Sequence, residues 1–400
     1  MLRLKDTRHA HTGAFLTSAI KLAEYYGFEH LDGALERAQK KMSSPRAISP
    51  RGTIALARRD EKSLLTVAKK TTLCVNANQP TSLVWRIEHT KDRPGSAVLE
   101  LHIIGAPTTV AEALLLTIVS IIADEAGVKE RTVSINSIGS HESSNRFVRD
   151  VGIFLRKHIE SISPSLRPRA ALDPVGTLVQ LIERQHPAIA RLPQSVEYLT
   201  EDERKRFWEL LEYLETLHLS YELNPQVLGS RDCWSHSLFE ISTKDPDTGS
   251  KIRFAAGGRY DPLATKIRGV ATPAVMVSIS CEARGQSRLK PKKHPAPAVY
   301  VAHLGNAAKR KVFSVLEILR HAKIPVHQSL LMERVGEQMA HAKQLGVPCI
   351  IIMGHKEALE DSVLVREVAT NSQDSVPIDR LIPYLRRHRI HTWKPARVSV

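Results

Sequence analysis

The residues whose types and spacing could support chemistry lie between positions 220 and 261. A polar stretch from Thr243 to Lys251 separates two alternating apolar runs, and this pattern predicts a two-stranded hairpin. The second run ends on Gly-Gly-Arg-Tyr-Asp at positions 257–261. A glycine pair at the end of a strand lets the backbone approach a small ligand, and the three polar residues that follow can supply contacts. An ordinary turn between two strands would show the same spacing, so both interpretations stay open.

This stretch resembles the two histidine-binding signatures of histidyl-tRNA synthetase, a class II aminoacyl-tRNA synthetase. The second signature stands intact at positions 257–261. The first reads Arg-Gly-Leu-Asp-Tyr-Tyr in the family and Gly-Ser-Arg-Asp-Cys-Trp at positions 229–234 here, so only Asp232 matches. The resemblance implies ligand-binding candidates at Arg51, His102, Asp232, Trp234, Gly257, Gly258, Arg259, Tyr260 and Asp261.

One departure from the family changes the charge of the site. Positions 49–53, Ser-Pro-Arg-Gly-Thr, resemble the family's Arg-Pro-Glu-Gly-Thr, whose glutamate holds the α-ammonium of the bound histidine. Arg51 replaces that glutamate. Two unit charges about 4 Å apart interact by roughly 4 kcal/mol at an effective dielectric constant of about 20, and here attraction becomes repulsion. An arginine pointing into solvent would remove the repulsion without restoring the lost ligand.

The strand at positions 83–88 resembles class II motif 2, whose arginine contacts the α-phosphate of ATP in the family. Arg86 and Glu88 match that motif and are the catalytic remnants that the resemblance supplies. Further along, the family has Phe-x-Gln and then a glutamate that reads the imidazole. Ser96, Val98 and His102 stand at those places. Valine cannot accept a hydrogen bond, so a second polar ligand of the family is missing.

The segment after Val275 stands where class II motif 3 is expected. Met276 and Ser280 replace two glycines of the family, and Ala283 replaces its ATP-binding arginine. Arg284 lies one residue further on, but one residue along a helix is a rotation of about 100°, which aims the side chain elsewhere. The resemblance therefore argues against ATP binding.

The elements that must position these residues follow from apolar periodicity. It predicts helices at 11–26, 110–126 and 141–158 and a buried strand at 132–139. The first helix resembles one that builds the class II dimer interface, which implies a homodimer. Residues 164–218 are helical and charged, with a packing face from Trp208 to Leu217, and resemble the family's small insertion that contacts the tRNA acceptor stem. Plain core helices would give the same pattern.

Beyond residue 297 the pattern alternates between strands and helices, which predicts a small, parallel-rich α/β domain. This part resembles the anticodon-binding domain of the histidyl, glycyl, threonyl and prolyl synthetases. The predicted fold is therefore α/β, with a class II synthetase-type antiparallel sheet and flanking helices, plus a C-terminal α/β anticodon-binding-type domain. The predicted boundaries are 1–283 for the synthetase-like domain with its insertion at 164–218, 284–296 for a basic linker, 297–390 for the second domain and 391–400 for a basic tail.

Net charge points to a polyanionic partner. The 400-residue chain has 42% apolar residues and a formal charge of +15, and phosphate contacts supply most non-specific affinity for nucleic acids. A solvated basic surface without function remains the alternative. The candidate nucleic-acid contacts are Arg284, Arg288, Lys290, Lys292, Lys293, Arg386, Arg387 and Arg389.

Four widely spaced cysteines suggest neither a zinc site nor a disulfide framework, so the sequence predicts no metal ligands. No apolar run approaches the roughly 20 residues needed to cross a bilayer, and residues 1–8 are charged, without a signal-type apolar block. The sequence therefore predicts a cytoplasmic protein with no membrane association.

These observations predict a histidyl-tRNA synthetase-like protein with a degenerate active site, acting as a module that binds tRNA or another RNA or as a regulatory module. One alternative is a working, diverged histidine–tRNA ligase, and only that interpretation requires ATP and Mg²⁺. Another is a role like that of the synthetase-like regulatory subunit of ATP phosphoribosyltransferase in histidine biosynthesis. The carboxy-terminal domain counts against the last alternative, because such subunits usually lack it.

Overall fold

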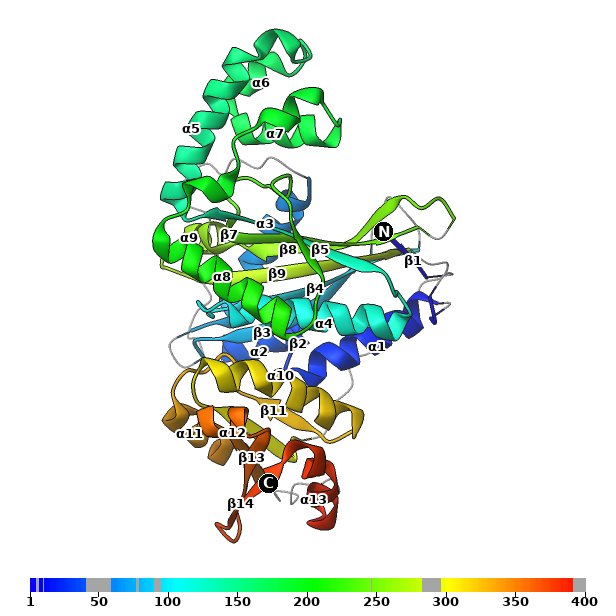
Figure 1. The fold of residues 1–400 in the computed structure, drawn as a ribbon, viewed down its shortest axis with the longest axis vertical. Helices are drawn as coiled ribbons and strands as arrows, with labels where there is room; N and C mark the ends of the chain where they lie inside the picture. The colour runs from blue at the N-terminus through cyan, green and yellow to red at the C-terminus, as the bar shows by residue number, and fades with distance from the viewer. Residues whose placement is uncertain are drawn as a thin grey trace. The chain divides into compact units, whose positions relative to one another are not determined.

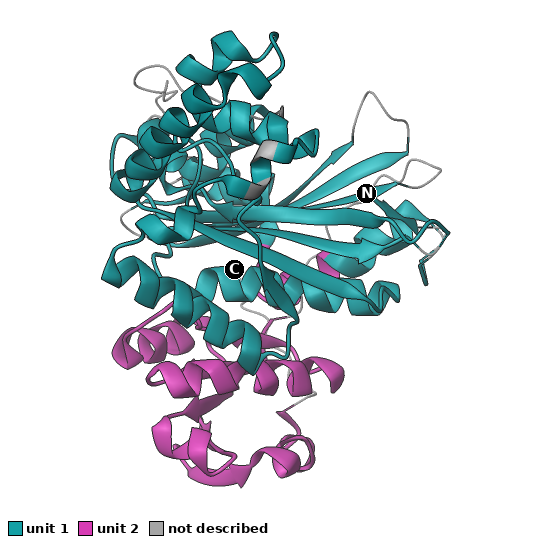
Figure 2. Ribbon diagram, turned by 45° about the horizontal axis from the view of Figure 1, so that its top comes forward, with its two compact units in different colours: residues 1–19, 29–288 teal, residues 20–28, 289–400 magenta. Residues whose placement is uncertain are grey.

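The computed structural model describes residues 1–4, 7–9, 11–40, 59–76, 79–89, 95–245, 247–282 and 296–390. The chain divides into two compact units (Figure 2). Unit 1 comprises residues 1–19 and 29–288, and unit 2 comprises residues 20–28 and 289–400. The domain boundaries expected from the sequence remain a prediction.

Unit 1 is built around a large mixed sheet with mainly antiparallel pairing (Figure 1). In the described residues nine strands form it, in the order β2-β3-β4-β9-β8-β7-β5-β6, with β1 paired to β9. Their bounds are β1 Leu2–Arg3, β2 Glu29–His30, β3 Ser82–His89, β4 Ser96–Ile104, β5 Arg131–Gly139, β6 Tyr221–Leu223, β7 Ser235–Lys244, β8 Lys251–Arg259 and β9 Ala274–Glu282. The expected class II-type sheet is present.

The predicted hairpin is confirmed. β7 and β8 pair antiparallel, and the polar segment between Lys244 and Lys251 connects them. The pairing register shifts between Ser235 and Leu238, where the strand contains an irregularity. Because side chains alternate between the two faces of a sheet, such a shift changes the direction in which the neighbouring residues point.

Helices cover both faces of this sheet (Figure 1). In the described residues the helices of unit 1 are α1 Thr12–Tyr25, whose residues 20–25 belong to unit 2, α2 Leu31–Lys40, α3 Arg59–Thr71, α4 Val110–Ala126, α5 His141–Lys157, α6 Arg167–Leu172, α7 Pro174–Glu183, α8 Glu201–Thr216 and α9 Asp261–Arg268. Short 3₁₀ helices also occur in this unit, among them Thr72–Cys74, Ile159–Ser161, Pro187–Arg191 and Ser195–Tyr198. The helices predicted at 11–26, 110–126 and 141–158 and the strand predicted at 132–139 are confirmed to within two residues.

The packing face predicted for α8 was wrong for Trp208. Leu210, Leu211 and Leu214 are buried, whereas Trp208 is 61% exposed. Two residues along a helix correspond to a rotation of about 200°, so Trp208 points away from the face that contains Leu210.

Within residues 296–390, unit 2 contains a five-stranded sheet in the order β11-β10-β12-β13-β14. Its strands are β10 Val299–His303, β11 Val326–Gln328, β12 Cys349–Met353, β13 Ser362–Glu367 and β14 Gln373–Pro377. Its helices are α10 Asn306–His321, α11 Val335–Leu345, α12 His355–Leu359 and α13 Leu381–Arg387, with a 3₁₀ turn at Ile378–Arg380. The predicted alternation is confirmed, but only β11, β10 and β12 run parallel, because β12–β13 and β13–β14 pair antiparallel.

Residues 20–28 belong to unit 2 through polar contacts with α10 and β11. Tyr26 Oη donates to the Glu317 carboxylate, and Gln328 Nε2 donates to the Tyr26 carbonyl oxygen at 2.9 Å.

Within the described residues, none of the helices has the length and apolar composition of a membrane span.

Candidate functional site

A row of polar side chains crosses one face of the unit 1 sheet. On β3, Arg86 lies directly opposite Glu100 of β4, and Val84 lies opposite His102. Arg86 Nε donates to Glu100 Oε2 at 2.6 Å, and its Nη2 donates to Glu88. Burial alone would raise the pKa of Glu100, but contacts with His102 and Arg86 hold it below its usual value. Arg86 is therefore held by two carboxylates on this face, in a place where it is only partly exposed.

The row continues into the interior through His102. Its Nδ1 lies 3.1 Å from Tyr260 Oη, and its Nε2 lies 3.5 Å from Glu100 Oε2. Tyr260 Oη also lies 3.5 Å from Thr71 Oγ1. Both His102 and Tyr260 have 0% exposure, and burial raises the pKa of the Tyr260 hydroxyl. Two of the predicted ligand-binding residues thus hydrogen-bond to each other inside the protein.

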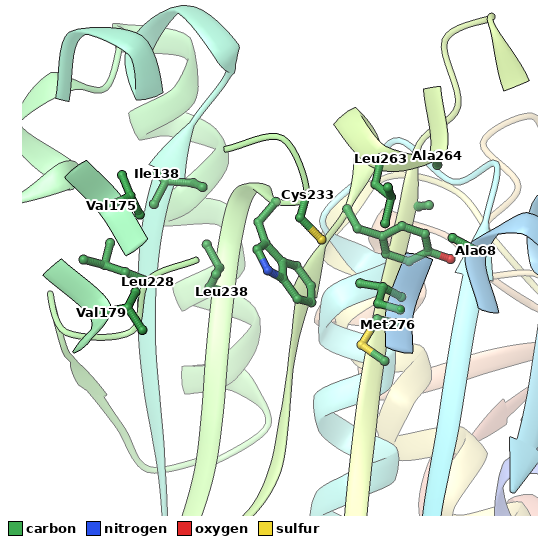
Figure 3. Close-up of a cluster of buried hydrophobic side chains, with 14 of the residues drawn as sticks. Ala68, Ile138, Val175, Val179, Leu228, Cys233, Leu238, Leu263, Ala264 and Met276 are labelled. Atoms are coloured by element: carbon green, nitrogen blue, oxygen red, sulfur yellow. The ribbon is translucent and has the colours of Figure 1, made fainter. Parts of the chain in front are cut away.

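Apolar side chains fill the space beside this pair. Met276 on β9 lies opposite His102 and is 5% exposed. Trp234 is 8% exposed and belongs to the same buried cluster, together with Cys233, Leu238, Leu263 and Tyr260. In the view of Figure 3, Leu263 and Met276 lie on one side of Cys233 in that cluster, and Leu238 lies on its other side. In the described residues, this part of the face is a packed core.

Trp234 is fixed by a buried acid that the sequence did not reveal. Trp234 Nε1 and the Ser230 amide both donate to Glu61 Oε1, at 3.0 and 2.8 Å. The indole also explains Gly229, because a Cβ at that position would lie 2.3 Å from Trp234 Cδ1. At position 229, where the family signature has arginine, this chain has glycine, which leaves room for Trp234.

The glycine pair of the second signature serves strand packing. A Cβ on Gly257 would lie 2.1 Å from the Met276 carbonyl oxygen, and a Cβ on Gly258 would lie 2.6 Å from the Ser237 carbonyl oxygen. Both contacts are with the backbone of neighbouring strands, which cannot move aside easily. These glycines allow β8 to approach β9 and β7, so the structure gives them a packing role.

Arg259 lies on the opposite face of the sheet from Arg86, and the prediction that it contacts a ligand is not supported. Its side chain has 0% exposure and donates from Nε and Nη2 to the two carboxylate oxygens of Glu112 on α4, at 2.9 and 2.5 Å. Arg259 Nη1 also donates to the Ala106 carbonyl oxygen at 3.0 Å. This buried ion pair anchors β8 to α4.

The two aspartates of the signatures lie away from the filled face. Asp232 and Asp261 both line an open groove of about 420 Å³. Asp261 Oδ1 accepts from the Ala274 amide at 2.7 Å and lies 3.4 Å from Arg259 Nη1, and burial raises its pKa. Asp232 Oδ2 lies 4.0 Å from Lys266 Nζ. The structure therefore separates the predicted site residues into a filled face, a buried ion pair and a groove.

His236 also lines this groove, and sequence reasoning missed it. Its φ of 51° is unusual for a residue with a side chain, and it falls at the irregularity of β7. Burial, together with Arg206 and Arg259, lowers the pKa of His236 to about 4, so the imidazole is neutral at pH 7. No sequence motif marks His236. Glu100 was missed as well, but a strand register that places it opposite Arg86 would have indicated it.

The remaining candidates are the residues predicted to contact nucleic acid and the positions at which the family binds its substrates. Arg51, Ala283 and the basic linker residues Arg284, Arg288, Lys290, Lys292 and Lys293 lie outside the described residues. Arg386 and Arg387 end α13 and are exposed, and the exposed Arg389 follows shortly after with a φ of 54°. These three arginines lie near the end of the described residues of unit 2.

Known proteins resemble both units. A family model described as anticodon binding domain matches residues 298–388. The histidine–tRNA ligase of Thermosynechococcus vestitus is 26% identical over 297 residues, which cover 74% of this chain and 69% of that protein. The histidine–tRNA ligase of Caldicellulosiruptor saccharolyticus is 27% identical over 314 residues, covering 76% of this chain and 73% of that protein.

A solved structure, apo histidyl-tRNA synthetase from S. aureus, covers 93% of this chain and 94% of its own, with 19% identity and a TM-score of 0.48. This chain is thus similar to histidine–tRNA ligases over about three quarters of its length, and residues 298–388 match an anticodon binding domain.

Proposed function

We propose that this protein binds tRNA and that its synthetase-type domain does not activate histidine. The observation that carries the proposal is the filled sheet face beside Arg86. His102 and Tyr260 hydrogen-bond to each other there without exposure to solvent, and Met276 and Trp234 pack into the same region.

The cost of opening this face supports the proposal. A tryptophan side chain buries about 150–250 Å², which at about 25 cal/mol/Å² amounts to roughly 4–6 kcal/mol. A ligand that displaced Trp234 would lose that amount from its binding energy, and Glu61 would lose the indole donor as well. Micromolar binding corresponds to about 8 kcal/mol, so displacement would leave an affinity in the millimolar range or weaker.

Adenylate formation would also require charges that the described residues of this face do not supply freely. The reaction depends on positioned cations around the phosphates and on a fixed amino acid, and loss of one electrostatic partner typically costs about 3 kcal/mol in the transition state. Val98 supplies no hydrogen-bond acceptor at its place on β4, and Arg86 is held by Glu88 and Glu100. Arg51 and Ala283, which depart from the family at charged positions, are predicted to weaken substrate binding further.

The RNA-binding part of the proposal rests on the second unit and on charge. Residues 298–388 match the anticodon-binding domain model, and the whole chain carries a formal charge of +15. Arg386 and Arg387 add exposed cations at the end of α13. Because phosphate contacts release counterions, the affinity for tRNA should fall steeply with salt. The homodimer implied by the resemblance is part of the same proposal, and light scattering during size-exclusion chromatography tests it.

Histidine-dependent exchange of pyrophosphate into ATP tests the catalytic claim. We expect the purified protein to match the background set by its own Arg86→Ala variant, while an active histidine–tRNA ligase measured in parallel gives a large signal. Exchange clearly above that background would contradict the proposal. Fluorescence anisotropy with labelled tRNA at 50 and 200 mM salt tests the RNA claim, and an affinity unchanged between the two conditions would contradict it.

A working but diverged histidine–tRNA ligase is the second candidate. It is favoured by the retained Arg86 beside Glu88 on β3 and by relatives that are histidine–tRNA ligases. ATP and Mg²⁺ would then be its cofactors. The exchange assay separates the two candidates directly, because only this one requires a histidine-dependent signal.

A further inference from the structure

Helix α13 and the residues that flank it carry arginines without partners. From Arg380 to Ile390 the sequence contains four arginines and no acid. Arg380, Arg386 and Arg387 are exposed, and among the described residues their side chains make no hydrogen bond or ion pair. A phosphate group that contacts these three side chains therefore displaces no existing partner.

Two aromatic rings lie among these arginines. The rings of Tyr384 and His388 are stacked, with centroids 4.3 Å apart and an angle of 21° between their planes. Tyr384 is partly buried, whereas His388 is exposed. The stack covers one face of the His388 ring, so the exposed imidazole offers its other face to a planar ligand.

Tyr384 gives the exposed ring a fixed support. Its Oη donates to Asp374 Oδ2 on β14 at 2.5 Å, which ties α13 to the edge strand of the sheet. Burial and this hydrogen bond raise the pKa of Tyr384 to about 12, so the hydroxyl keeps its proton at pH 7. Leu381 and Leu385 of the same helix are buried. The stack is therefore held in place before any ligand arrives, which reduces the ordering that binding requires.

Helical spacing brings the arginines and the rings together. Residues three or four positions apart are neighbours on the surface of a helix. Arg380 stands four residues before Tyr384, while Arg387 and His388 stand three and four residues after it. Arg380 caps α13 at its start and His388 caps it at its end. The two arginines thus flank the stacked rings along the helix.

An unpaired nucleotide matches this combination better than a duplex does. Unpaired bases stack on aromatic side chains, histidine included, while arginine contacts the neighbouring phosphates. The bases of a duplex are already stacked on one another and cannot lie on a protein ring in the same way. The exposed His388 ring therefore favours single-stranded RNA.

We propose that α13 and its flanking residues form a stacking site for an unpaired nucleotide of RNA, in which the base lies on His388 and the adjacent phosphates contact Arg380 and Arg387. This inference rests on the proposed function, because it places on unit 2 one contact of the RNA that the protein binds. It adds a base contact to the phosphate contacts expected at Arg386 and Arg387.

Fluorescence anisotropy of the full chain with a short labelled oligouridylate strand, with an RNA duplex of the same length and with tRNA tests the inference. His388→Ala removes the stacking surface and should weaken binding of the single strand roughly five- to hundredfold. Duplex binding should not change, because phosphate contacts supply it. His388→Phe keeps a planar ring and should bind the single strand like the unaltered protein. Arg380→Gln should reduce the slope of log affinity for the single strand against log salt by about 0.7.

Matched control variants exist on other helices of unit 2. His321 ends α10 and is 65% exposed beside Glu317. Lys343 is an exposed cation on α11. His321→Ala should leave the affinity for the single strand unchanged, and Lys343→Gln should leave its salt slope unchanged. Because His388 is exposed, His388→Ala should keep the thermal midpoint of the unaltered protein.

Three results would count against the inference, and they separate it from the proposed function. Equal single-strand affinities for His388→Ala and His321→Ala, with tRNA still bound, would overturn the stacking site and leave the proposed function intact. Equal weakening of single strand and duplex by His388→Ala would also overturn it, because loss of a stacked base spares the duplex. If the unaltered protein binds none of the three RNAs, the proposed function fails and this inference fails with it.

Discussion

Replacement of Glu112 by glutamine tests whether Arg259 stabilises the fold, as the structure indicates, or contacts a ligand, as the sequence suggested. Glu112 accepts hydrogen bonds from Arg259, from Arg206 Nη2 at 3.2 Å and from Ser237 Oγ at 3.1 Å. Glutamine keeps the size but turns an amide donor towards the guanidinium groups. Removal of one charge from a buried pair typically costs about 3–5 kcal/mol, because the other charge stays buried without a counterion. We expect the free energy of unfolding of unit 1 to fall by that amount.

The same carboxylate predicts a pH dependence. Burial alone would raise the pKa of Glu112, but Arg259 and Arg206 lower it from 4.5 to about 2. A carboxyl group with a lowered pKa in the folded state stabilises the fold fully above about pH 4.5 and loses that contribution as the pH falls towards 2. At about 1.4 kcal/mol per pKa unit, the contribution is on the order of 3 kcal/mol. Glu112→Gln should therefore show a weaker loss of stability on acidification than the unaltered protein.

Urea unfolding followed by tryptophan fluorescence measures both effects, because Trp85 and Trp234 are buried in unit 1. Glu130→Gln is the matched control. Glu130 pairs with Lys244 at 3.2 Å with both side chains more than 70% exposed, so its loss should change stability by no more than about 0.5 kcal/mol. Equal unfolding midpoints for Glu112→Gln and Glu130→Gln would refute the structural role assigned to Arg259.

Three further predictions follow from packing and charge. Trp234→Ala should lower the free energy of unfolding by about 3–5 kcal/mol, whereas Trp208→Ala on the exposed face of α8 should have little effect; similar urea midpoints for the two variants would contradict the packed face. Gly257→Ala should destabilise the protein by about 1–3 kcal/mol because its Cβ meets backbone, and an unchanged thermal midpoint would favour a ligand-facing role for this glycine. Replacing Arg386 and Arg387 together by glutamine should reduce the slope of log affinity for tRNA against log salt by about 2, and an unchanged slope would exclude them as phosphate contacts.

Several strands and helices of this protein could be predicted from local pattern. Alternating apolar residues on either side of a polar stretch place the β7–β8 hairpin, and the continuous apolar run of α4 marks a helix covered on several sides. The alternation beyond residue 297 likewise predicts the second unit. In each segment there, the apolar residues repeat with the spacing of the helix or strand that the segment forms. These features depend on residues that are close to one another in the chain, so the sequence alone is enough to predict them.

The location of each candidate side chain depended on the tertiary structure. One residue along a strand reverses the direction of a side chain, so Arg259 faces α4, although Gly258 before it lies on the face of Arg86. Glu61 meets Trp234 across 173 positions of sequence, and no local pattern could pair them.

Which side chains fill the site likewise depends on packing between segments that are far apart in the sequence. Gly229 leaves room for the Trp234 indole, and Trp234 and Met276 belong to one buried cluster, so whether a cavity remains depends on their combined shape. The groove that Asp232 and Asp261 line has the same origin, since it forms where the starts of three elements meet. The sequence by itself indicated the resemblance and the order of elements, and only tertiary packing determined which of the predicted site residues are buried and which line a groove, because cavities are created by residues that are far apart in the chain.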